Sequence, residues 1–137
     1  QLNENNFKIQ VSVEKTSALR QAVNRSEYLL FKKSWVADYA DEENFMNVFY
    51  SKNFCPNGAN YFHYSNPEFD KLFGEVQNEN NPNSKIHKYQ KMERILIDDS
   101  PFIPLYYDQA IRLVNHRITG LTSNPMNLLN LKNVKKE

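Results

Sequence analysis

The sequence predicts an α/β fold: a β-α-β unit, then an antiparallel helix pair, then short terminal strands. Three patterns predict it. Apolar and polar residues alternate between Phe7 and Val13, as in a strand with one buried face. An apolar run at 29–31, inside a second predicted strand at 28–36, is typical of a strand covered on both faces. Two stretches of helical periodicity then begin at Asn66 and Ser84.

A short helix is predicted between the two strands. Thr16 or Ser17 can cap it, and Leu19, Ala22 and Val23 supply its apolar face. A strand, a helix and a strand within about 30 residues form a β-α-β unit, in which parallel strands are joined by a right-handed crossover.

The helix pair carries clear start and stop signals. Asn66 suits the N-cap and Pro67 the first helical position. The polar stretch 78–83 predicts a turn, after which Ser84 begins the second helix. That helix should end by Ser100, because a proline follows it.

The C-terminal part has weaker signals. Residues 102–107 and 111–114 predict short strands, the first at an edge because it contains Pro104. Residues 120–130 show no period, and the charged stretch 132–137 is expected to fray.

Bulk composition excludes several classes of protein. With 137 residues the chain is long enough for one ordinary domain. Its 17 basic and 16 acidic residues leave no net field that would attract nucleic acid. The three glycines form no phosphate-binding loop, and no apolar run approaches the roughly 20 residues of a membrane span.

Cysteine and histidine usage gives no sign of a metal or cofactor. Cys55 is the single cysteine, so an internal disulfide is excluded. His63, His87 and His116 lie far apart in the sequence and share no ligand spacing with it. We therefore predict neither a metal nor a cofactor.

Asp38 is the first candidate for a functional residue, because it follows the apolar strand 28–36 directly. Open α/β sheets place their ligands at the carboxyl ends of strands. Asp38 could instead have only a structural role, as a cap or a negative charge in the turn before Phe45. Trp35 could be a core residue. A third possibility is an enzyme that uses Asp38 with the nearby acids at 41–43, although no second, environmentally distinct carboxylate is evident.

Four segments, in order, carry a resemblance to a known family. Trp35-Val36-Ala37-Asp38-Tyr39, followed by Asn44-Phe45, resembles the Trp-x-Ala/Gly-Asp-Tyr segment of the dipeptide/oligopeptide-binding (family 5) class of extracytoplasmic solute-binding proteins of ABC importers. Residues 64–72 look like its Asn-Pro-Glu-Phe/Tyr-Asp helix start. Residues 89–107 are similar to its helix, Asp-x-Pro and Pro-Leu-Tyr-Tyr segment, and 114–125 to its terminal valine and glycine segment.

The resemblance implies a two-lobed, periplasmic-binding-protein-like fold, of which this chain is the C-terminal fragment. Residues 1–109 would be part of the second ligand-binding lobe, and 110–137 would return toward the first lobe. The implied function is not enzymatic: it is the binding of a solute, expected to be a peptide, and its delivery to an ABC permease.

The resemblance also implies roles for individual residues. Asp38 would pair with the α-amine of the peptide and Trp35 would form a wall of the site. Main-chain groups of Ser34 and Val36 would pair with the peptide backbone as an added strand does.

Two positions depart from the family pattern. Lys32 stands where some relatives have an arginine that meets the peptide carboxylate, and lysine lacks the bidentate fork. Asp108 falls where some relatives have a ligand-facing tyrosine. A non-peptide ligand such as nickel, heme or a sugar therefore stays an alternative.

Location and partners follow from the same resemblance. The full-length protein is expected in the periplasm or at the cell surface, held by a lipid anchor. Its partners would be the solute and the permease subunits, with no nucleic acid. The apolar residues Leu113, Val114, Leu128 and Leu129 are expected to face the absent lobe, so that the fragment alone could self-associate.

Overall fold

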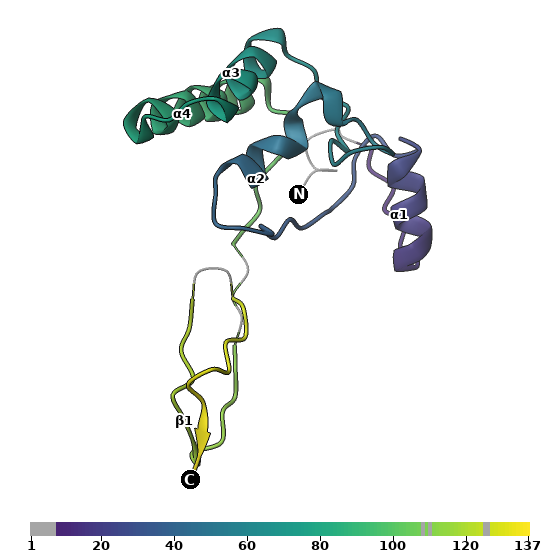
Figure 1. Ribbon diagram of the computed structural model, residues 1–137. Helices are drawn as coiled ribbons and strands as arrows, with labels where there is room; N and C mark the ends of the chain where they lie inside the picture. Colours follow the sequence, from purple (N-terminus) through teal and green to yellow (C-terminus); the bar gives the residue numbers. More distant parts are fainter. Residues whose placement is uncertain (1–7, 108, 110, 125–126) are drawn as a thin grey trace.

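The computed structural model describes residues 8–107, 109, 111–124 and 127–137. It is mainly helical (Figure 1). The elements, in chain order, are the helix α1 (Thr16–Asn24), the short helix α2 (Glu43–Met46), the 3₁₀ turns η2 (Asn47–Phe49) and η3 (Ser51–Asn53), the helices α3 (Pro67–Gln77) and α4 (Pro82–Asp99), and the two-residue strands β1 (Ile118–Thr119) and β2 (Lys135–Lys136).

The core lies between α3 and α4, which run side by side, and is closed by η2 (Figure 1). Phe69, Phe73 and Met92 are fully buried in it. Burying such a side chain contributes about 1.5–3 kcal/mol. The other buried members of this core are Val48, Phe49, Val76, Tyr89 and Leu96.

Both long helices begin at an asparagine followed by a proline. The Asn66 side chain accepts hydrogen bonds from the backbone N–H groups of Glu68 (2.9 Å) and Phe69 (3.2 Å), which confirms the predicted cap of α3. Asn81 caps α4 in the same way. The predicted start at Ser84 is thus two residues late, because Pro82 occupies the first turn of the helix rather than the preceding turn.

The end of α4 is fixed to the start of α3. The Asp99 carboxylate accepts hydrogen bonds from the Tyr64 hydroxyl (2.6 Å) and from the side-chain amide of Asn66 (2.8 Å). Ser100 then adopts a left-handed conformation, with φ of 49°, and Pro101 prevents the helix from continuing. The predicted end of this helix is confirmed.

The predicted β-α-β unit is wrong for the residues the structure describes. Its helix is present as α1, although Thr16 is the first helical residue rather than the cap, and the N-cap is Lys15, without a side-chain bond. Neither 8–13 nor 28–36 is a strand. Val13 is 92% exposed and Leu30 is 71% exposed. A strand forms only when neighbouring backbone pairs with it, and no described segment pairs with these two.

The C-terminal part also differs from the prediction. Residues 102–107 and 111–114 are extended but unpaired, whereas the stretch expected to fray contains β2, which pairs antiparallel with β1. Gly120 permits this pairing: its φ is 77°, and a Cβ there would clash with the Asn133 carbonyl oxygen.

The segment from residue 111 onward projects away from the helices (Figure 1). Several of its large apolar side chains are exposed, including those expected to face another lobe: Leu113, Val114, Leu128 and Leu129. The lobe assignment and self-association stay predictions.

Candidate functional site

The candidate site is the loop 36–40, and Trp35 fixes its first end. The indole Nε1 of Trp35 donates to both the backbone oxygen (3.1 Å) and the side-chain oxygen (2.9 Å) of Asn44. Asn44 is buried, and the half-buried Trp35 ring packs against the helical core. The residue before the loop is therefore attached to the folded part of the molecule.

Asp41 fixes the other end of the loop. Its carboxylate accepts hydrogen bonds from the Lys85 ammonium (2.7 Å), the Tyr89 hydroxyl (2.9 Å) and the backbone N–H of Glu43 (2.9 Å). Lys85 and Tyr89 belong to α4 and lie more than 40 positions after Asp41 in the sequence, so a distant helix holds this end of the loop.

The protonation equilibria of these groups reflect their mutual contacts. Partial burial of Asp41 opposes its ionisation, but the hydrogen bonds from Lys85, Glu43 and Tyr89 outweigh it and lower the pKa of Asp41. The hydrogen bond to Asp41 raises the pKa of Lys85. Burial, followed by the bond to Asp41, raises the pKa of Tyr89. Asp41 and Lys85 are therefore both charged at neutral pH.

Asp38 lies between these two anchors and is exposed. Its carboxylate makes no hydrogen bond or ion pair with any residue the structure describes. The neighbouring Ser34 and Val36 are also exposed. The loop thus presents one carboxylate to solvent, while the carboxylate three residues later is fully engaged.

The remaining candidates lie on or near the 102–107 segment. The Lys32 ammonium donates to the Tyr106 hydroxyl (3.0 Å) and lies 5.3 Å from the centre of its ring. Asp108 falls outside the described residues. Lys32 and Tyr106 are 74 positions apart in the sequence, so the structure places the start of the candidate stretch beside the segment that follows α4.

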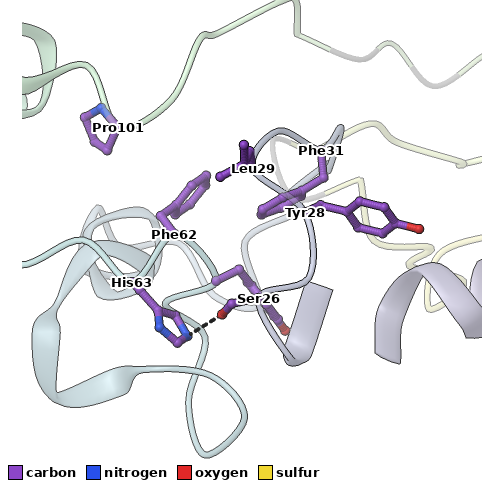
Figure 2. Close-up of a pocket in the computed structure, with 8 residues that line it drawn as sticks. Ser26, Tyr28, Leu29, Phe31, Phe62, His63 and Pro101 are labelled. Carbon is purple, nitrogen blue, oxygen red and sulfur yellow. Dashed lines mark hydrogen bonds between the residues drawn. The ribbon is translucent and has the colours of Figure 1, made fainter. Parts of the chain in front are cut away.

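A pocket of about 170 Å³ opens nearby, but none of the described candidates lines it (Figure 2). The Ser26 hydroxyl and His63 Nε2 lie 3.2 Å apart there, and the His63 ring stacks on Phe54. The sequence analysis missed this pair, because 37 residues separate its members. No carboxylate orients His63 in the part of the chain described, so the pair lacks the third member of a catalytic triad. The residues that line the pocket are Ser26, Tyr28, Leu29, Phe31, Tyr61, Phe62, His63 and Pro101.

Two of the acids proposed for an enzyme, Asp41 and Glu43, are occupied by structural contacts. Asp41 is held as described, and Glu43 accepts a hydrogen bond from the Tyr39 hydroxyl (2.7 Å). Among the described residues, no group of three or more His, Cys, Asp or Glu side chains could hold a metal ion. In the same residues, no helix is long and apolar enough to cross a membrane.

No protein-family model matches the chain. The dipeptide-binding protein of Bacillus subtilis is 27% identical over 127 residues, which is 93% of this chain. This chain is homologous to the dipeptide- and oligopeptide-binding proteins. The periplasmic oligopeptide-binding protein of Salmonella typhimurium is 31% identical over 75% of the chain.

The homology to dipeptide- and oligopeptide-binding proteins confirms the resemblance found in the sequence, and it has a defined extent. A probable D,D-dipeptide-binding periplasmic protein of Escherichia coli is 27% identical over 89% of the chain. The chain spans only about a fifth of the length of these relatives: 21%, 24% and 18%, respectively, for the Bacillus, Escherichia and Salmonella proteins. All three are binding proteins rather than enzymes, by their names.

Proposed function

We propose that this chain forms part of the second lobe of an extracytoplasmic solute-binding protein that captures peptides and delivers them to an ABC permease. Residues 1–109 belong to that lobe, and 110–137 return toward the first. Homology to dipeptide- and oligopeptide-binding proteins supports this class of ligand. The single observation that carries the site is the Asp38 carboxylate, which is exposed and unpaired between two fixed ends of its loop.

In this proposal Asp38 pairs with the α-amine of the peptide. An ion pair in water contributes only about 0–1 kcal/mol, so the first lobe must cover it to make it strong. The exposed part of Trp35 forms a wall beside the ligand. The backbone of Ser34 and Val36 belongs to no helix and makes no hydrogen bond to any described segment, so it can pair with a peptide as an added strand does.

The other end of the peptide has a cationic candidate in Lys32. Its ammonium, which donates to the Tyr106 hydroxyl, supplies the positive charge that would meet the peptide carboxylate. Asp108 is proposed as a further ligand-facing residue. The full-length protein would act in the periplasm or at the cell surface, where a lipid anchor would hold it near the permease.

The test uses Asp38→Asn in the full-length protein that carries this chain. This substitution keeps the shape of the side chain and removes its charge. Removing one member of a buried charged pair costs about 3–5 kcal/mol, so calorimetry should show a loss of affinity of two orders of magnitude or more for peptides with a free N-terminus. N-acetylated peptides should lose little.

Asp98→Asn is the matched control, because Asp98 is an exposed carboxylate on α4 that pairs with Arg94. Asp98→Asn should leave the affinity for free peptides and the affinity for N-acetylated peptides unchanged. Equal losses for free and acetylated peptides in Asp38→Asn would overturn the role of Asp38. If the protein binds no peptide but binds another solute, the peptide assignment is overturned.

A further inference from the structure

The loop that presents Asp38 has no core of its own. Between Trp35 and Asp41 its residues are mostly exposed, and only Ala37 is partly covered. Besides the hydrogen bond from the Tyr39 hydroxyl to Glu43, its position therefore depends on contacts at its ends. One end is held inside the local sequence, by the bond from Trp35 to Asn44. The other is held by a different element of the fold, through Asp41 and α4.

Lys85 is the charged member of that second attachment. Its ammonium and the Asp41 carboxylate are each about one-third exposed, at 31% and 32%, so their pair is partly screened from water. Lys85 also lies in the field of Glu42 and Glu43 and 5.7 Å from the centre of the Tyr89 ring. The charged groups of the turn 41–43 that act on Lys85 are all negative, so its ammonium is attracted to this turn as a whole.

We propose that Lys85 is a positioning residue for ligand binding: by holding Asp41 it fixes the loop 36–40 and so places the Asp38 carboxylate for an ammonium group of the ligand. This inference rests on the proposed function, because it assumes that Asp38 meets a ligand amine. It adds a residue of α4, 47 positions after Asp38 in the sequence, to the machinery of the site.

Lys85 also decides which carboxylate of the loop is available. Asp38 and Asp41 are three residues apart, and both could attract a cationic ligand. Lys85 and Tyr89 occupy Asp41, whereas Asp38 has no partner among the described residues. Of these two carboxylates, Asp38 is therefore the one that a ligand ammonium finds without a partner among the described residues. Loss of Lys85 frees a second carboxylate and loosens the attachment at the same time.

The experiment compares Lys85→Met with Lys88→Met in the full-length protein. Lys88 lies about one turn further along α4. Like Lys85 it forms ion pairs, in its case with the carboxylates of Glu75 and Glu79, so it is a matched control that does not touch the loop. The first measurement is amide hydrogen exchange without ligand at Glu43 and Asn44, whose N–H groups bond to Asp41. Exchange should accelerate in Lys85→Met and stay unchanged in Lys88→Met.

The second measurement is the calorimetric affinity for trialanine and for N-acetyl-trialanine. Lys85→Met should lower affinity for trialanine about tenfold, in the middle of the range for coupled neighbouring residues, and affinity for the acetylated peptide less than twofold. Lys85→Arg should keep both affinities at the level of the unsubstituted protein, because arginine also donates to a carboxylate. A role in general stability alone would lower both affinities together.

The outcomes separate the two proposals. If the unsubstituted protein binds the free and acetylated peptides equally, the role of Asp38 fails, and this inference fails with it. If the unsubstituted protein prefers the free peptide and Lys85→Met keeps both that preference and the amide exchange, the role of Asp38 survives and this inference is overturned.

Discussion

The helix pair 66–99 and the segments 8–15 and 28–36, which form no strand, are all rich in apolar residues, yet they differ sharply in burial. Phe73 of α3 is completely buried, whereas Leu30 in the second of these segments is 71% exposed. A helix pairs its backbone groups within its own segment, and then needs only one neighbour for its apolar face. A strand needs a neighbour for its backbone as well. Apolar sequence therefore becomes packed structure here only where the backbone pairing is local.

The candidate site combines both kinds of region. Asp38 stands at the end of an extended segment, but its loop is attached to the helical region through Asn44 and Asp41. The geometry of the site thus depends on the stability of the helices as well as on the loop.

The largest expected effect comes from removing a core ring. Phe73→Ala should destabilise the chain by about 3–5 kcal/mol, because it leaves a cavity beside Phe69 and Tyr50. The matched variant Leu30→Ala should stay within about 0.5 kcal/mol, as expected for an exposed side chain. Urea denaturation of both variants measures the difference. A similar cost for both would show that the 28–36 segment is packed in solution, and would remove the contrast between the two regions.

A smaller effect is expected at the start of α4. Asn81→Ala removes the side chain that accepts hydrogen bonds from Asn83 and Ser84, and should cost about 1 kcal/mol. Asn80→Ala is the control, since Asn80 is exposed and makes no side-chain hydrogen bond to the described residues. The shift of the denaturation midpoint is the measurement. No shift for Asn81→Ala would mean that packing of α4, rather than its cap, decides where the helix begins.

The smallest effect concerns pH. The Ser84 hydroxyl, the backbone of Asn81 and the Lys88 ammonium hold the pKa of Glu79 at about 2, below its ordinary value of 4.5. Since the folded pKa is depressed, the contribution of Glu79 to stability is complete above pH 4.5 and is lost as the pH falls toward 2. Glu79→Gln should therefore flatten the acid side of the stability profile.

Denaturation midpoints measured across that range check this prediction. Glu93→Gln serves as the control, because Glu93 is exposed on α4 and makes no ion pair with the described residues. An unchanged acid slope in Glu79→Gln would contradict the prediction.

Local signals in the sequence predicted the helices well. Asn66-Pro67 identified the start of α3, and Pro101 identified the end of α4, because caps and proline act within a few residues. The same Asn-Pro signal at Asn81 was interpreted as a turn, which moved the start of α4 by two residues. The predictions of strands at 8–13 and 28–36 were wrong. Alternation of apolar and polar residues shows that a segment suits a strand, but it does not show which backbone would pair with it.

Some features of the candidate site could likewise be predicted from the sequence, and others could not. Asp38 could be selected from its position after an apolar run, and the resemblance at Trp35 to Tyr39 is confirmed by homology, although the role of Asp38 in binding stays a proposal. The contact between Asp41 and Lys85 was not predicted. Its members are 44 residues apart, and the sequence shows three adjacent acids without indicating which one meets a cation.

Trp35 gives the candidate site an optical signal of its own. It is the single tryptophan of the chain, and its indole N–H is bonded to Asn44 at the base of the loop. The emission of an indole ring shifts with its hydrogen bonding and with the polarity around it. Within this chain, tryptophan fluorescence therefore reports on one place, the point where the loop that carries Asp38 joins the helical core.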